Sequence, residues 1–279
     1  MASEAKNSGS GTQRTRRNIM KMGAILASSA VAGAYSAHAA TSTTTAACAV
    51  VRCNCFLTGT KIRTADGERK IEDLAIGDLL PTMFGGLRPI QWIGCYSFKK
   101  SDPSKPWVKD ALPVRIARSG LAPNVPHADL YVTALHSVLI DGVLVPAETL
   151  INGATITRYE APEYDELEYF HIKLECHDVI YAEGAPAETL LDVEESAVNF
   201  AEYLRRFGTP TTGEARCAPL LPVWGGRNEL KSRFRSALSP WIDLRDQADV
   251  VRDRMEERAG VLERTGVGLF EAPASRPRI

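Results

Sequence analysis

The chain has 279 residues, which is enough for one large domain or two modest ones. Hydrophobic residues make up 44% of the sequence and charged residues 24%, a balance typical of a globular protein. The net charge of −1 gives no sign of nucleic-acid binding, and no apolar run is long enough to predict stable membrane insertion. The six cysteines form no CxxC pair, so we expect no metal site and no cofactor.

Residues 1–39 have the composition of an export signal. Arg16 and Arg17 precede a mildly apolar stretch rich in Ala, Gly and Ser, which ends in the small-x-small sequence AHAA. This arrangement resembles a bacterial twin-arginine signal, which implies export of the folded protein to the periplasm or the cell exterior. We expect cleavage after Ala39, and the alternative is an uncleaved amphipathic N-terminus. Residues 40–54 are small, Thr-rich and without period, which predicts a flexible lead-in.

Residues 55–191 show the pattern of β structure. Short alternating apolar runs are separated by turn residues, and Gly and Pro lie between the runs. Two stretches read as hairpins around an Asp-Gly pair, residues 60–74 and residues 136–145. Because no long helical period interrupts these strands, the sequence predicts one compact, all-β domain.

After Leu191 the hydrophobic period becomes that of helices. Residues 193–208 place apolar side chains at helical spacing and end in Gly. Residues 228–266 are charge-rich and helical with a break at Pro240, a pattern typical of a solvated helix face with i,i+4 ion pairs. We expect a mostly helical extension over 192–279 with a disordered tail, and the sequence names no protein partner for it.

Three side chains in the β region are suited to acyl chemistry. Cys55 stands where the domain begins, and Thr133 and His136 follow as T-x-x-H at a strand end. A thiol could attack an acyl group, and an imidazole could protonate a departing nitrogen. A hydroxyl could hold the geometry or donate to a developing oxyanion. The competing interpretation is an ordinary core, because cysteines are often plain buried residues.

Three motifs in order resemble those of Hint domains, the module shared by hedgehog autoprocessing domains and inteins. The first is CFLTGT from Cys55, the second is VTALHSVLI at 132–140, and the third is EYFHIKLECHDV at 168–179. The resemblance covers about half of the chain and implies a horseshoe-like β disc. It also implies an N-to-S acyl shift, in which the Cys55 thiol attacks the Asn54 carbonyl carbon and turns the peptide bond into a thioester.

The resemblance also implies roles for the histidines and the threonine. Thr133 occupies the position that polarises the scissile amide, and His136 the position that protonates its nitrogen. His171 stands where the family has Asp, so it could act as a base toward the Cys55 thiol or be an ordinary strand histidine. His177 matches the motif histidine, for which we expect a structural role.

Two further expectations concern the third motif and the chain after it. Residues 168–184 read as strand structure, in which residues 176–178 would alternate faces, so at most Cys176 and Asp178 share one. Inteins end in His-Asn followed by Cys, Ser or Thr, and no such triad occurs after Gly184. We therefore expect no complete splicing.

The sequence predicts autoprocessing between Asn54 and Cys55, with the chain's own N-terminal segment as substrate. Water or a small nucleophile would then resolve the thioester. The alternative is a catalytically silent Hint-fold binding or structural module, favoured if Cys55 forms a disulfide with Cys48, Cys53 or Cys176. A secreted cysteine protease acting in trans is a weaker third interpretation, because its local signatures are missing.

Overall fold

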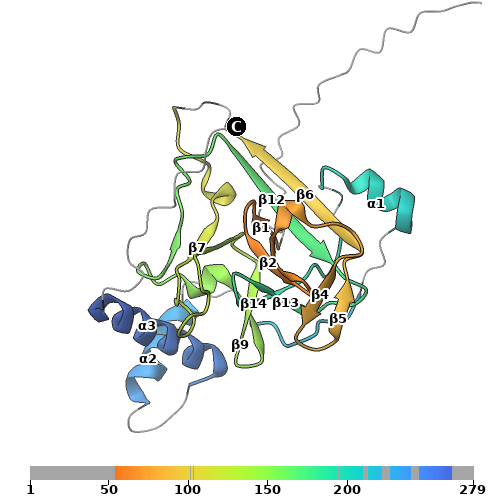
Figure 1. Cartoon of the computed structure of the whole chain (residues 1–279). Coiled ribbons are helices and arrows are strands. Elements are labelled where there is room, and N and C mark those ends of the chain that lie inside the picture. Colours follow the sequence, from red (N-terminus) through yellow and green to blue (C-terminus); the bar gives the residue numbers. More distant parts are fainter. Residues whose placement is uncertain are drawn as a thin grey trace, which may run out of the picture. The chain divides into compact units, whose positions relative to one another are not determined.

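The computed structural model describes residues 54–265 apart from 101, 103, 194, 196, 210–212, 222–226 and 240–244 (Figure 1). All described residues belong to one compact unit, Thr44–Ile279. The expected signal with Arg16 and Arg17, the lead-in up to residue 53, the break at Pro240 and the C-terminal tail lie outside the described residues.

Two six-stranded sheets and a separate hairpin make up the β part of the described chain. The first sheet has the order β11-β7-β8-β1-β12-β6, that is Ile156–Arg158, Val114–Ile116, Leu130–Val132, Phe56–Leu57, Glu166–Lys173 and Trp92–Lys99. The second has the order β10-β9-β14-β13-β2-β3, that is Val143–Pro146, Ser137–Ile140, Ala185–Glu188, Val179–Ala182, Lys61–Thr64 and Gly67–Lys70. The hairpin pairs β4 (Leu79–Thr82) with β5 (Gly86–Pro89). Short 3-10 turns are η3 (Ile71–Asp73), η4 (Lys109–Ala111) and η5 (Ala147–Leu150).

The predicted mainly β fold is confirmed, and its hairpins follow from local turn chemistry. Asp141 and Gly142 join β9 to β10 with φ of 51° and 80°. Glu183 and Gly184 join β13 to β14 with φ of 47° and 78°. Two-residue turns with both φ values positive match the twist of antiparallel strands, and Gly adopts them without strain. Both predicted Asp-Gly hairpins, β2–β3 and β9–β10, are present.

The prediction of a strand over residues 176–178 is wrong. β12 pairs with β6 in the first sheet, whereas β13 pairs with β2 and β14 in the second. The chain crosses between the two sheets here, so no strand pairing is available to the residues in between. Cys176 is exposed, while His177 and Asp178 are both buried. The Asp178 carboxylate lies 3.0 Å from the guanidinium of Arg88, which anchors the crossing to β5.

Among the described residues, three helices follow the strands: α1 (Phe200–Phe207), α2 (Arg227–Leu238) and α3 (Gln247–Thr265). As predicted, α1 ends at Gly208, whose φ of 77° suits a residue without a Cβ. It begins only at Phe200, so the predicted helical run from residue 193 is too long at its start. None of the helices in the described ranges is long and apolar enough to cross a membrane.

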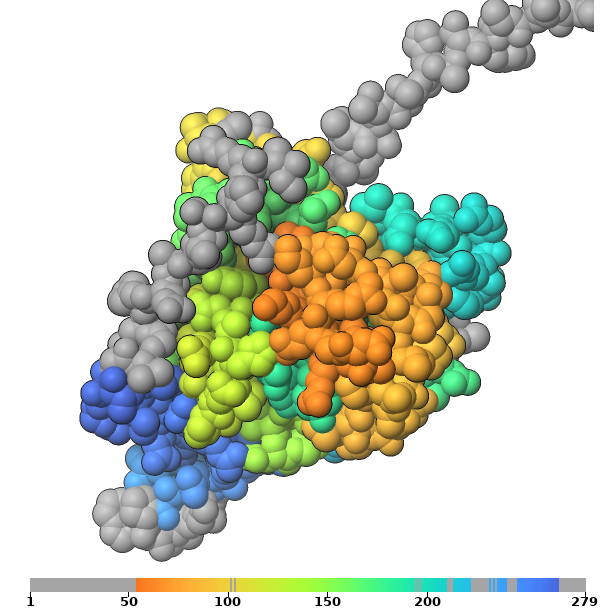
Figure 2. Space-filling model, viewed as in Figure 1, coloured from red at the N-terminus to blue at the C-terminus, as the bar shows by residue number. Residues whose placement is uncertain are grey.

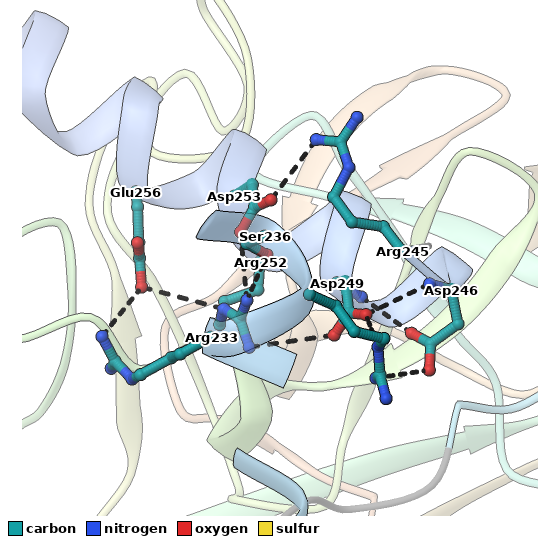
Figure 3. Close-up of polar contacts among 9 residues, drawn as sticks. Arg233, Ser236, Arg245, Asp246, Asp249, Arg252, Asp253 and Glu256 are labelled. Atoms are coloured by element: carbon teal, nitrogen blue, oxygen red, sulfur yellow. Dashed lines mark hydrogen bonds and ion pairs between the residues drawn. The ribbon is translucent and has the colours of Figure 1, made fainter. Parts of the chain in front are cut away.

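Charged side chains join α2 to α3 (Figure 3). The buried carboxylate of Asp249 accepts a hydrogen bond from Arg235 at 2.5 Å, and Ser236 donates to Asp253 at 2.9 Å. One i,i+4 pair, Arg252 with Glu256, also forms within α3 at 3.9 Å. The alternating acidic and basic residues therefore form ion pairs between α2 and α3 as well as within the exposed face of α3.

The α3 helix packs against the β strands. Val251 and Met255 are each 1% exposed and belong to the same hydrophobic cluster as Val145 of β10. The Arg258 side chain donates to the backbone oxygen of Ser119 at 2.8 Å. In Figure 2 the blue helices lie directly against the yellow-green surface of β7 to β10.

Shortening a buried α3 side chain should destabilise the β strands that it covers. We expect Met255→Ala to lower the free energy of unfolding by roughly 2–5 kcal/mol and to speed hydrogen exchange in β9 and β10. Glu257→Ala, at an exposed position of the same helix, is the matched control. Unchanged exchange in β9 and β10 after Met255→Ala would show that α3 is not part of this core.

Candidate functional site

Strand register places Cys55 between two predicted site residues. Cys55 comes directly before β1, which pairs with β8 on one side and β12 on the other. Phe56 is paired with both Val132 and Phe170. Because both pairings are antiparallel, the residue before Phe56 lies opposite the residues that follow its partners, Thr133 and His171. Cys55 is 1% exposed.

Thr133 holds the peptide bond that joins Asn54 to Cys55. The Cys55 N–H donates to Thr133 Oγ1 at 2.9 Å, and the Thr133 N–H donates to the Cys55 carbonyl oxygen at 2.9 Å. In a trans peptide the N–H and the C=O point in opposite directions. The Thr133 hydroxyl therefore lies at the nitrogen side of the amide, and an oxyanion on Asn54 would develop on the other side.

His171 faces the Cys55 thiol from a pocket of aromatic rings. Its Nδ1 lies 3.7 Å from Cys55 Sγ, and its ring centroid lies 5.3 Å from that of Trp92 and 5.0 Å from that of Tyr96. Gly94 is the cross-strand partner of His171 in β6. A Cβ at Gly94 would lie 1.9 Å from His171 Nε2, so only glycine leaves room for this ring.

His136 is fully buried beside the same peptide bond. Its ring centroid lies 4.2 Å from that of Phe56, and neither ring nitrogen has a hydrogen-bond partner within the described residues. Burial lowers the pKa of His136 to about 4, against the opposing effects of the Glu188 carboxylate and of nearby backbone groups, including those of Cys55 and Asn54. These backbone groups are close to the ring but outside hydrogen-bond geometry.

Both site histidines are uncharged at neutral pH. Burial, together with the neighbouring His136, lowers the pKa of His171 to about 3. Two adjacent imidazoles in an apolar environment disfavour charge on either ring. A neutral His171 can accept a proton from a thiol at Nδ1, which is the chemistry that this arrangement allows.

Glu188 is a buried residue at this site that the sequence analysis missed. Its Oε1 accepts hydrogen bonds from the Asn54 side-chain amide at 2.8 Å and from the Ser137 N–H at 2.9 Å. Its Oε2 lies 3.2 Å from His177 Nε2. Burial alone would raise the pKa of Glu188, but the hydrogen bonds from His177 and Ser137 and the nearby His136 outweigh it and lower the pKa.

One feature of the sequence, a repeated pentapeptide, could have drawn attention to Glu188. The sequence PAETL occurs at 146–150 and again at 186–190, beginning four residues after Gly142 of one hairpin turn and two residues after Gly184 of the other. The first copy puts Glu148 at a partly exposed position, 3.7 Å from Arg158. The second copy puts Glu188 in the interior, so the repeat marks the position without indicating its burial.

A segment of the C-terminal extension reaches the far side of Glu188. The Cys217 N–H donates to His177 Nδ1 at 3.1 Å, and Arg216 lies 3.5 Å from Glu188 Oε2. The segment is held by β10, where Leu144 donates to the Pro219 oxygen at 2.7 Å. Residues beyond the β region therefore contribute to the surroundings of the Asn54–Cys55 bond.

The remaining cysteines bear on the disulfide alternative. Cys176 is a free, exposed thiol, so the Cys55–Cys176 disulfide is not formed. Cys48 and Cys53, the other candidate partners, lie outside the described residues. Among the residues that the structure describes, no group of three or more His, Cys, Asp or Glu side chains could hold a metal ion.

Comparison with known proteins points to one family. A Hint domain family model matches residues 54–194. A bacterial intein-like domain from Clostridium thermocellum is 13% identical, with 50% of this chain and 99% of that chain covered and a TM-score of 0.36. A DnaB intein from Synechocystis sp. PCC 6803 is 13% identical, with 49% and 99% covered and a TM-score of 0.34. No curated protein matches the sequence.

The buried histidines should make folding stability depend on pH. Between the unfolded pKa of about 6.5 and the folded values of about 4 for His136 and 3 for His171, the unfolded chain binds protons that the folded chain does not. Stability should therefore fall on acidification below pH ~6.5, by up to about 1.4 kcal/mol per pH unit for each histidine. Urea unfolding at several pH values gives the free energy of unfolding at each pH. This free energy should change less steeply with pH in His136→Asn and in His171→Asn than in the unchanged chain. If both variants show the same dependence of unfolding free energy on pH as the unchanged chain, these protonation states are contradicted.

Gly94 offers a steric test of the His171 position. Gly94→Ala should destabilise the fold by roughly 1–3 kcal/mol because the new methyl group overlaps the imidazole. His171→Ala removes that overlap, so the double variant should be more stable than the sum of the two single effects predicts. Additive effects in thermal unfolding would show that the ring does not occupy this space.

Proposed function

The chain belongs to the Hint domain family, and we propose that it cleaves its own backbone between Asn54 and Cys55 by an N-to-S acyl shift. One observation carries the proposal. The thiol of Cys55 faces Nδ1 of His171 at 3.7 Å, while the N–H of the same residue is held by Thr133 at 2.9 Å. Nucleophile and target carbonyl belong to adjacent residues, so their proximity is covalent and costs no association entropy.

The reaction begins at sulfur. The Cys55 thiol passes its proton to His171 Nδ1, and the sulfur attacks the carbonyl carbon of Asn54. The neutral His171 ring offers a lone pair at Nδ1 for this proton. The burial that lowers its pKa to about 3 also makes it a weak base, so the transfer is uphill and must accompany the attack of sulfur on carbon. Thr133 fixes the orientation of the amide through the Cys55 N–H. A tetrahedral intermediate with a negatively charged oxygen on Asn54 forms.

The carbon–nitrogen bond then breaks. The departing nitrogen takes up a proton from His136, whose ring neighbours the backbone of Asn54 and Cys55. Because the His136 ring is neutral before the reaction, it first takes up the proton that sulfur gave to the neighbouring His171. One proton has then moved from sulfur to nitrogen, both rings are neutral again, and charge is conserved. The products are a thioester between Asn54 and Cys55 Sγ and a free amine on Cys55.

The thioester is resolved by water or a small nucleophile, which releases the N-terminal segment. No His-Asn triad of the intein type follows Gly184, so ligation of the flanking segments is not part of the proposal. We place the reaction after export directed by residues 1–39, in the periplasm or outside the cell. Cleavage of the signal after Ala39 would leave residues 40–54 as the released peptide.

A silent Hint-fold binding or structural module is the second candidate. The 1% exposure of Cys55 favours it, because a nucleophile must reach the thioester for cleavage to follow. The two candidates differ in whether thiols or hydroxylamine cut the chain.

Intact mass spectrometry of the purified full chain tests the reaction. Incubation with dithiothreitol or hydroxylamine should produce a fragment that begins at Cys55. Cys55→Ala should abolish this fragment, since no thioester can form. Cys176→Ala, which removes an exposed thiol, is the matched control and should cleave like the unchanged chain. An unchanged chain that stays intact under both reagents would favour the silent module.

A further inference from the structure

Four donors converge on the carboxylate of Glu188, whose side chain is 0% exposed. Asn54 Nδ2 and the Ser137 N–H share Oε1, at 2.8 Å and 2.9 Å. His177 Nε2 and the Arg216 guanidinium share Oε2, at 3.2 Å and 3.5 Å. A buried carboxylate is costly unless its oxygens are satisfied, and here each oxygen has two partners.

The tautomer of His177 follows from its other contact. His177 Nδ1 accepts the Cys217 N–H at 3.1 Å, so in the neutral ring Nε2 carries the hydrogen and donates to Glu188. Only an ionised carboxylate, which has no hydrogen of its own, can accept from all four groups. The lowered pKa of Glu188 is consistent with this arrangement.

We propose that Glu188 is a specificity-determining residue that recognises the side chain preceding Cys55 and selects a hydrogen-bond donor there over an acidic or apolar side chain. The inference rests on the proposed acyl shift and names the residue that the shift accepts at the cleaved position. Asn54 meets the requirement, because its carboxamide gives one hydrogen to Oε1 and carries no charge.

Other side chains at position 54 fail for different physical reasons. An aspartate would bring a second carboxylate to about the distance of the present 2.8 Å contact, and two ionised carboxylates repel strongly at such a separation. An alanine would leave Oε1 with Ser137 alone. The contact also orients Asn54, whose carbonyl carbon is the electrophile, so its loss should slow the attack.

The first experiment measures dithiothreitol-induced cleavage of full-length variants at neutral pH. Asn54→Ala should cleave on the order of tenfold slower than the unchanged chain, as expected for loss of a hydrogen bond to a charged group. Asn54→Asp should be slower again, by a further factor of about ten. Equal rates for Asn54→Asp and the unchanged chain would overturn the specificity while leaving the acyl shift intact.

A pH profile separates recognition from a general structural role. The groups facing Glu188 are His177 before β13, His136 before β9, and Arg216 with Cys217 from the extension. All of them are present in Asn54→Ala as well. The cleavage rate of Asn54→Asp relative to Asn54→Ala should therefore rise as pH falls from 7.5 to 5, when the new carboxyl takes up a proton. A ratio that does not change with pH would overturn the proposal.

The repeated pentapeptide supplies a matched control. Glu188→Gln introduces a hydrogen donor among existing donors and should slow cleavage at least tenfold. Glu148→Gln changes the same residue of the other PAETL copy, whose carboxylate lies 3.7 Å from Arg158, and should leave the rate unchanged. Equal rates for the two variants would count against a role for Glu188.

The same recognition can be measured without the reaction. In a Cys55→Ala background, the melting temperatures of Asn54→Asp and Asn54→Ala should differ at neutral pH and converge at pH 5. If the unchanged chain gives no thiol-induced fragment, the proposed acyl shift is wrong. The melting temperatures still show whether Glu188 discriminates between side chains at position 54. Melting curves that differ by the same amount at both pH values would overturn recognition of residue 54 by Glu188.

Discussion

The double pairing of β1 is the constraint on which the site depends. This two-residue strand lies between β8 and β12, and its register puts Thr133 and His171 opposite Cys55. A shift of one residue would turn every side chain of the strand to the other face of the sheet and separate the thiol from the imidazole. Gly94 reinforces this register, because the ring of His171 fits only where β6 has no side chain.

Burial sets the chemistry of the groups thus assembled. His136 and His171 lie in apolar surroundings that lower their pKa values, so the site contains two neutral imidazoles beside a thiol. Close to the junction a buried charge is retained on Glu188, where four donors compensate it. The neutral His171 is therefore available as a proton acceptor next to sulfur, and the negative charge of Glu188 lies beside the Asn54 side chain.

Local sequence signals predicted the parts of this fold that local physics determines. The Asp-Gly turn at 141–142 and the helix end at Gly208 follow from residues that tolerate positive φ. The motif order brought Cys55, Thr133 and His171 into one hypothesis, and the sheet places these residues side by side.

Long-range contacts explain what the sequence did not reveal. The segment at 176–178 reads as a continuous strand, but it crosses between sheets whose pairing is decided by distant residues. Glu188 resembles a surface glutamate until the donors around it are known, and two of them, Arg216 and His177 held by Cys217, depend on the extension. The family match ends at residue 194, whereas groups that contact this carboxylate continue to residue 216.

The acyl shift can be observed at the bond itself. The chain contains a single Asn-Cys pair, so ¹³C at asparagine carbonyls and ¹⁵N at cysteine label one ¹³C–¹⁵N bond, that of Asn54–Cys55. The account predicts that this one-bond NMR correlation disappears on incubation with hydroxylamine, while a hydroxamate carbonyl signal appears. A correlation that keeps its full intensity throughout the incubation would contradict the account.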